Sequence, residues 1–280
     1  MSHHSEDPER LQDPDFLSKS ALLFKLRDLR ALKVNFRSTM NEKDVIPDRN
    51  VDFPREYVIS NLHRAELEKR DFDLNRLSNN DVKAFVNTLH TIVMNAGIDI
   101  GTSESHTDSL VADLLFCVLA FHKWPLTVAL HPTYKFAVGE VVVSAKADFV
   151  ISNQTYFVLV VEDKHLVNVR PTNDYGEPQV LAEMLACGEE NIRLARRSYN
   201  MIMFSVRVIS TYVTFYRTTI NKEYWDELGD GCPRQQSLTI FRWPGNSSDP
   251  FEGFDLAEPD GRRSVLEALC KIRHYLLNSD

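Results

Sequence analysis

Short runs of alternating and β-branched apolar residues occupy the middle of the chain, beginning after Trp124-Pro125. Such runs, bounded by turn residues, are typical of β-strands. The pattern predicts strands over 126–130, 134–138, 141–152 and 156–161. Asn153-Gln154 separates the last two runs, so we expect these two to pair as a β-hairpin.

Apolar residues recur at helical spacing on both sides of these strands. The spacing predicts helices over 16–36, 82–96, 103–121, 178–197 and 262–277. Two further strands are predicted over 206–216 and 238–243. A helix, a group of strands, a second helix and another strand in succession predict an α/β fold.

The same pattern divides the chain into three parts. Residues 1–15 are charged and have no apolar periodicity, so they predict a disordered tail. Residues 16–100 predict a helical N-terminal region, in which 37–56 has the proline and polar content of a linker. Residues 101–280 hold the predicted strands and form the expected main domain with a C-terminal extension.

Charged residues interrupt the predicted hairpin. Asp148 lies inside the first apolar run, and Glu162-Asp163-Lys164 ends the second. Because side chains alternate between the two faces of a strand, Glu162 and Lys164 should point the same way. Closure of the hairpin at Asn153-Gln154 would put Asp148 across from Glu162. Two carboxylates and an ammonium then suit either a divalent-metal site or an ordinary salt-bridged sheet end.

Composition narrows the class of protein. The chain has 280 residues, of which 43% are hydrophobic and 26% charged, enough for a sizeable core. A net charge of -8 argues against a globally basic surface for nucleic acid but is compatible with a local basic groove. The four cysteines form no C-x-x-C pair, which disfavours a zinc knuckle.

Two further features concern location. The N-terminal residues lack the apolar core of a secretory signal, and the apolar stretch 110–121 is too short to span a membrane. We therefore expect an intracellular protein, nuclear or cytoplasmic, that does not bind membranes.

The order of elements and the charged motif together resemble the PD-(D/E)XK nuclease superfamily. Its signature is an acid followed by (D/E)-x-K on an αβββαβ core, and the resemblance covers residues 103–217. Ala147 stands where the family has proline. A second match to acid-x-Lys, Asp81-Val82-Lys83, opens a predicted helix and therefore has the wrong context. The resemblance implies a restriction-endonuclease-like core with a mixed sheet.

The resemblance also implies roles for the charged residues. Asp148 and Glu162 would bind Mg²⁺ or Mn²⁺, with the main-chain carbonyl of Asp163 as a further ligand. Lys164 would orient or activate the attacking water. Glu104 resembles an additional metal-binding acid that some members carry on the first helix, although an acid in a first helical turn is also favoured by the helix dipole.

Gln179 and Glu183 lie four residues apart on the helix after the motif, and therefore on one face. Gln179 resembles the glutamine of the Q-x-x-x-Y element of RecB-like members, with Glu183 in place of the tyrosine. The other interpretation is the polar stripe of an amphipathic helix.

Basic and aromatic residues near the predicted core are candidates for contact with a substrate. The phosphate-binding candidates are Lys146, His165, Arg170, Arg193, Arg196 and Arg197. The base-stacking candidates are Tyr212, Phe215, Tyr216 and Trp225. Arginines near a helix end are also stable in water, and aromatics on a strand also suit the core.

The implied function is a metal-dependent nuclease that hydrolyses phosphodiester bonds, with DNA favoured over RNA as substrate. The alternative is a catalytically inactive nuclease-like module that binds nucleic acid or a protein partner. No P-loop, G-x-G-x-x-G, G-x-S-x-G or H-E-x-x-H sequence occurs, so other common catalytic classes lack their fingerprints.

Overall fold

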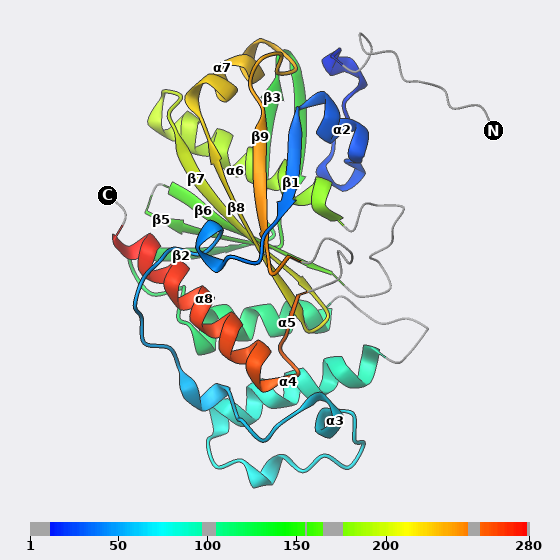
Figure 1. Ribbon diagram of the computed structural model, residues 1–280, viewed down its shortest axis with the longest axis vertical. Coiled ribbons are helices and arrows are strands. Elements are labelled where there is room, and N and C mark those ends of the chain that lie inside the picture. The colour runs from blue at the N-terminus through cyan, green and yellow to red at the C-terminus, as the bar shows by residue number, and fades with distance from the viewer. Residues whose placement is uncertain (1–11, 97–104, 155, 165–175, 246–252, 279–280) are drawn as a thin grey trace, which may run out of the picture.

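The computed structural model describes residues 12–96, 105–154, 156–164, 176–245 and 253–278. Within β6 (Tyr156–Lys164) it describes only the backbone of 157–160 and 162–164. A mixed β-sheet flanked by helices forms its centre (Figure 1), so the predicted α/β class is confirmed. Of the predicted tail 1–15, residues 1–11 lie outside the described part of the structure.

The main sheet has the strand order β1-β9-β8-β7-β6-β5-β2, and β10 pairs with β8 outside this path. Neighbouring strands are parallel in β1/β9 and β6/β7 and antiparallel in the other pairs. The strands are β1 (Val34–Ser38), β2 (Leu126–Leu130), β5 (Phe149–Asn153), β7 (Met201–Ile209), β8 (Tyr212–Ile220), β9 (Leu238–Trp243) and β10 (Phe254–Asp255). A parallel pair requires a crossover, which α6 (Glu177–Ala195) provides between β6 and β7.

A second, two-stranded sheet is formed by β3 (Thr133–Val138) and β4 (Val141–Lys146). It continues the register of β2 and β5, because Thr133 pairs with Lys146 and Leu130 with Phe149. The four strands are therefore one long hairpin with a break in the middle. At this break the His131 N–H donates to the Asp148 carbonyl over 2.8 Å. The single strand predicted over 141–152 is thus divided at Ala147-Asp148.

The hairpin predicted around Asn153-Gln154 is confirmed, since Asn153 pairs with Tyr156 between β5 and β6. Gln154 takes a φ of 53°, the left-handed conformation that a tight turn needs. The helix predicted over 178–197 is confirmed as α6, and the strand predicted over 238–243 as β9.

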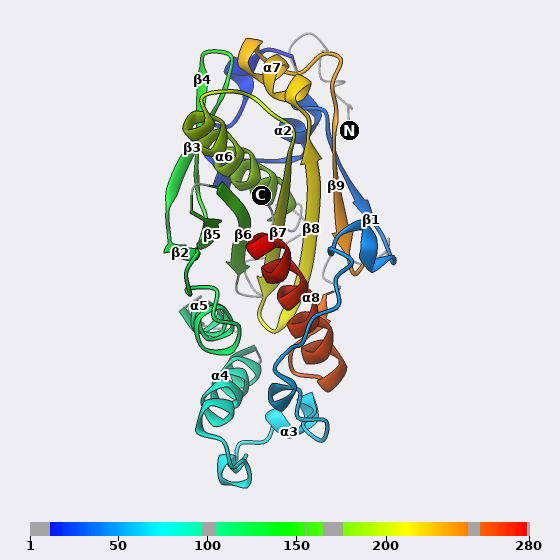
Figure 2. The same ribbon diagram turned by 90° about the vertical axis from the view of Figure 1, so that its left-hand side faces the viewer.

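Helices cover both faces of the main sheet (Figures 1 and 2). One face packs against α5 (Ser105–Ala112) and α8 (Pro259–Asn278), and α4 (Asn80–Ala96) packs against α5 in the same hydrophobic core. The other face packs against α2 (Leu26–Ala31), α6 and α7 (Lys222–Asp230). The helices predicted over 82–96 and 262–277 are confirmed as α4 and α8, and the one over 103–121 continues after α5 as a π-helical segment, η6 (Asp113–Val118).

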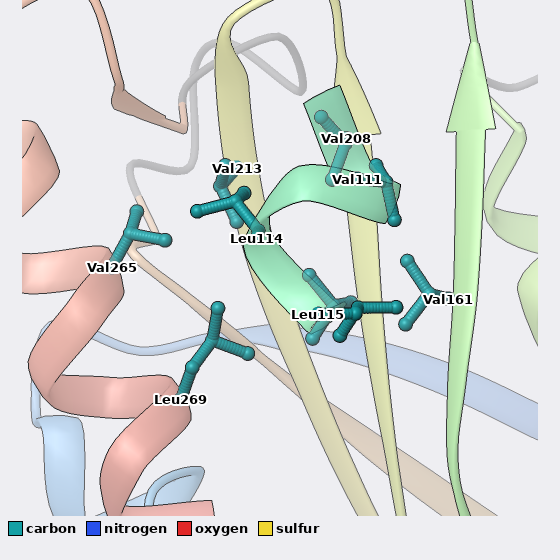
Figure 3. A pocket seen from close by; sticks show the side chains of 9 residues that line it. Val111, Leu114, Leu115, Val161, Val208, Val213, Val265 and Leu269 are labelled. Carbon is teal, nitrogen blue, oxygen red and sulfur yellow. The ribbon is translucent and has the colours of Figure 1, made fainter. Parts of the chain in front are cut away.

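Figure 3 shows the core between the sheet and α8, where Leu114 and Leu115 of η6 lie among valines from three strands. Val161 of β6, Val208 of β7 and Val213 of β8 all line this small apolar hollow. All three strands therefore present these residues to the same face. This face carries one of two hydrophobic core clusters, and the second lies between the other face of the sheet and α6.

The helix predicted over 16–36 is wrong. The segment forms two 3₁₀ turns, η1 (Pro14–Phe16) and η2 (Ala21–Leu23), then α2 and strand β1. The buried Asp28 carboxylate accepts from the backbone N–H groups of Ser18 and Lys25, each at 2.9 Å, and so ties the extended chain to the start of α2. Lys33, with a φ of 50°, ends α2, after which the chain pairs with β9.

The single strand predicted over 206–216 is also wrong. The chain turns at Ser210-Thr211, where Ser210 has a φ of 57°, and forms the antiparallel pair β7 and β8. No glycine or asparagine marks this turn in the sequence.

Short elements complete the described chain: η3 (Glu42–Asp44), η4 (Arg55–Tyr57), α3 (Arg64–Leu67) and η5 (Leu74–Arg76). They share a hydrophobic core with α4 and α8. Among the helices that the structure describes, none has the length and apolar character needed to cross a membrane.

Candidate active site

Backbone register brings the two halves of the predicted motif to one level of the sheet. Phe149 of β5 pairs with Val161 of β6, so Asp148, immediately before Phe149, lies at the level of Glu162. On the other side, Glu162 pairs with Arg207 of β7, and Lys164 with Ile209. The side chains of Glu162, Asp163 and Lys164 lie outside the described part of the structure.

Asp148 sits in the break between β4 and β5, and its side chain is 24% exposed. One carboxylate oxygen, Oδ1, is 3.7 Å from Nδ1 of His131, whose side chain is 47% exposed. His131 itself takes a φ of 49°. The carboxylate at the break is therefore partly accessible to solvent. Sequence reasoning missed His131, although His131-Pro132 between two predicted strands marks the break.

Gln179 and Glu183 share one face of α6, as their spacing predicts. Gln179 Nε2 donates to Glu183 Oε1 over 2.9 Å, and Glu183 is fully buried. Its charge raises the pKa of the Cys187 thiol one turn further on, where burial is the larger cause. Burial of a carboxylate costs free energy. The presence of one at position 183 therefore favours a functional role over the solvated polar stripe of an amphipathic helix.

Arg207 begins a polar network on the α6 face of the sheet that the sequence did not indicate. Arg207 is fully buried, and its guanidinium lies 5.5 Å from the centre of the Tyr216 ring. The Tyr216 hydroxyl donates to Glu177 Oε1 over 3.3 Å, and Glu177 is paired with Arg242 at 2.7 Å. Arg242 also donates to the Ser38 hydroxyl of β1.

This network connects β7, β8, β9 and β1 to the first turn of α6. Burial raises the pKa of the Tyr216 hydroxyl far above its ordinary value, with Arg207 opposing the rise, so the hydroxyl stays protonated and serves as a donor.

The burial of the predicted base-stacking and phosphate-binding residues can be compared with the predictions. Phe215, Tyr216 and Trp225 are buried in the core, so the prediction that they stack bases is wrong. Arg193 is held by Glu190, with Nε 2.8 Å from Oε2. Lys146, Arg196 and Arg197 are exposed, and Tyr212 is partly exposed beneath the Arg64 guanidinium.

The predicted metal shell is described only in part. Glu104 lies outside the described residues, as do His165 and Arg170. Among the side chains that the structure does describe, no three from His, Cys, Asp and Glu form a metal-binding group. Asp148 is the one predicted ligand whose side chain is described.

Neither the protein-family models nor the curated proteins contain a match to this chain. The residues and their arrangement therefore carry the functional argument. That arrangement is a partly exposed carboxylate at a strand break, an acid-x-Lys motif at the same level of the sheet, and a buried polar network of Arg207, Tyr216, Glu177 and Arg242 at the start of α6.

Proposed function

We propose that this protein is a metal-dependent nuclease that hydrolyses phosphodiester bonds in DNA. The observation that carries the proposal is the register that sets Asp148 at the level of Glu162, with Lys164 two residues further along the same strand. Asp148 and Glu162 are distant in sequence, and the hairpin is what brings them to one level of the sheet.

The order of the elements supports the proposal. α5 precedes the antiparallel strands β2, β5 and β6, and α6 then crosses to β7, which is parallel to β6. This αβββαβ order is the one implied by the resemblance to PD-(D/E)XK nucleases, with β3 and β4 as an extension of the first hairpin. The strands β8, β9 and β1 are additions at the other edge of the sheet.

The donor set fits a hard divalent cation. Asp148 offers an accessible carboxylate, and carboxylate and carbonyl oxygens are the ligands that Mg²⁺ and Mn²⁺ prefer. Glu162 and the main-chain carbonyl of Asp163 would complete the protein's share of the shell, with Glu104 as an optional member. The bound metal would neutralise charge that develops on the phosphate.

The remaining residues act on the substrate and on one another. The Lys164 ammonium would favour deprotonation of the attacking water and attract the phosphate. Glu183 holds the Gln179 amide in one orientation at the start of α6. Arg207, fully buried on β7, pairs in the sheet with Glu162 and so brings a guanidinium to the level of the motif.

The test is a cleavage assay on plasmid, duplex and single-stranded oligonucleotides with Mg²⁺, Mn²⁺ or EDTA. We expect cleavage by the wild type with either metal, and a loss of about 10²-fold or more in Asp148→Asn, Glu162→Gln and Lys164→Met, because each removes charge stabilisation from the reacting centre. EDTA should abolish cleavage.

Asp226→Asn and Lys222→Met serve as matched controls, since these residues form an exposed pair on α7 and should leave the rate unchanged. Cleavage that persists in all three site variants would contradict the proposal. A wild type that never cleaves, yet binds nucleic acid, would support the inactive module instead.

A further inference from the structure

Exposed aromatic and cationic residues gather at the end of the sheet opposite the acid-x-Lys motif. Trp124 precedes β2 and is 78% exposed, and Tyr156, the first residue of β6, is 47% exposed. Arg196, Arg197 and Tyr199 follow α6 and precede β7. Since β6 ends at Lys164, its whole length separates this surface from the candidate active site.

Direct contacts show that these segments meet. The rings of Tyr156 and Tyr199 lie 6.3 Å apart, edge to face. The N–H of Gln154, in the β5–β6 turn, donates to the Pro125 carbonyl over 3.3 Å, so Trp124 stands beside this turn. Arg197 is close enough to Tyr199 to oppose the effect of burial, which raises the pKa of that hydroxyl to about 12.

Packing in the hydrophobic core does not account for the position of Trp124, because its side chain is exposed. The other two tryptophans, Trp225 and Trp243, are buried at 4% and 9% exposure. A large exposed aromatic ring is typical of a binding surface. Lys123 also lies exposed beside Trp124.

The cations on this surface differ from the acids in their pairing. Among the residues that the structure describes, Lys123, Arg196 and Arg197 form no ion pair. The nearby acids are engaged, Glu190 by Arg193 and Asp226, which is bonded to Ser198, by Lys222. Unneutralised cations next to exposed rings are the combination that proteins use for single-stranded nucleic acid, because the rings stack on bases while the cations contact phosphates. Bases in a duplex do not offer their faces in this way.

We propose that this surface binds single-stranded nucleic acid, with bases stacking on Trp124 and Tyr156 and phosphates contacting Lys123, Arg196 and Arg197. The choice of nucleic acid as the ligand rests on the proposed function. The site is distinct from the cleavage site, and binding can be measured without cleavage.

Binding at Trp124 can be measured by tryptophan fluorescence, because the other two tryptophans are buried and should not contact the ligand. In EDTA, titration with oligothymidylates of about 4 to 16 nucleotides should quench the tryptophan fluorescence. Trp124→Phe should abolish the quenching but retain binding, measured by anisotropy of a labelled oligonucleotide. Trp124→Ala should weaken binding about tenfold or more, as expected for the loss of one stacked base.

Arginine variants test the phosphate contacts. Arg196→Gln and Arg197→Gln should each reduce the slope of log K against log[salt] by about 0.7, the value for one phosphate contact in a single strand. Phe16→Ala and Arg70→Gln change an exposed aromatic and an exposed arginine in η1 and in the segment after α3, and should leave binding unchanged.

Unchanged affinity in Trp124→Ala and in the arginine variants would overturn the inference, as would equal affinity for duplex DNA. Equal affinity for polyglutamate would also overturn it and would indicate an acidic protein partner. Quenching without any cleavage by the wild type would contradict the nuclease alone. Cleavage that depends on Asp148 and Lys164, without quenching, would contradict this surface alone.

Discussion

Glu177 and Arg242 form an ion pair that is almost closed to water, with side chains only 14% and 12% exposed. Removal of one partner leaves the other charge buried and uncompensated, which typically costs about 3–5 kcal/mol, whereas removal of both is much less costly. The pair joins residues that are far apart in the sequence, at the start of α6 and at the end of β9.

At the residue scale we therefore expect Arg242→Met to lower the free energy of unfolding by about 3 kcal/mol or more. The double variant Glu177→Gln/Arg242→Met should recover part of this loss. Urea denaturation of the four proteins in the cycle measures the coupling. Lys43→Met and Asp48→Asn, at an exposed pair, provide the reference and should couple by less than about 1 kcal/mol. Additive effects at Glu177 and Arg242 would contradict the role assigned to their contact.

A second residue-scale expectation concerns Glu189 on α6. Burial raises the pKa of this carboxyl above its ordinary value. The folded state therefore binds the proton more tightly than the unfolded state, so the charged form destabilises the fold above the folded pKa and has no such effect below the unfolded pKa. Glu189→Gln should raise the free energy of unfolding at pH 7 and lose this advantage as the pH falls towards 4. An equal effect at both pH values would contradict the assignment to ionisation.

At the element scale, Arg262 joins the start of α8 to the N-terminal region. The buried Arg262 guanidinium donates to the carbonyls of Val58, Leu256 and Ile59 over 2.8, 2.9 and 3.0 Å, and to that of Leu62. These bonds hold the start of α8 against the segment before α3.

Arg262→Met should lower the free energy of unfolding by about 3–5 kcal/mol, because several buried carbonyls lose their donors. Hydrogen exchange should increase first around residues 58–62. Its neighbour Arg263 is exposed, and Arg263→Met should change stability by less than about 0.5 kcal/mol. Equal stability of the two variants would show that the bonds have no net effect.

Prediction from the sequence succeeded where local pattern and structure coincide. The hairpin at Asn153-Gln154, and helices α4, α6 and α8, follow from period and turn chemistry. The helix over 16–36 failed because Asp28 makes contacts that compete with helical hydrogen bonds, and the strand over 206–216 failed because Ser210-Thr211 gives no turn signal. Local contacts that depend on one side chain are invisible to a periodicity argument.

The part of the candidate site that one hairpin forms could be predicted from the sequence, but the part that joins distant elements could not. Asp148 and Glu162 could be placed at one level because a hairpin connects them. Arg207, Glu177 and Arg242 could not, since their contacts join elements that are distant in sequence, and charged residues at strand and helix ends ordinarily suggest solvent.

For the whole molecule, a bound metal should stabilise the fold by mass action. At a Mn²⁺ concentration of 100 times Kd, the increase in the free energy of unfolding is about 2.7 kcal/mol. Thermal denaturation should therefore show a rise in Tm with Mn²⁺ in the wild type and a smaller rise in Asp148→Asn, with Asp226→Asn behaving as the wild type. The same rise in all three would place the metal elsewhere.

Helix α6 begins beside Gln179 and ends beside Arg196, and its 19 residues make it about 28 Å long. A continuous helix of this kind is a rigid spacer. If both proposals hold, a strand of nucleic acid held at Arg196 would run a fixed distance to the Gln179 end of this helix, so the protein would measure its product by length rather than by sequence.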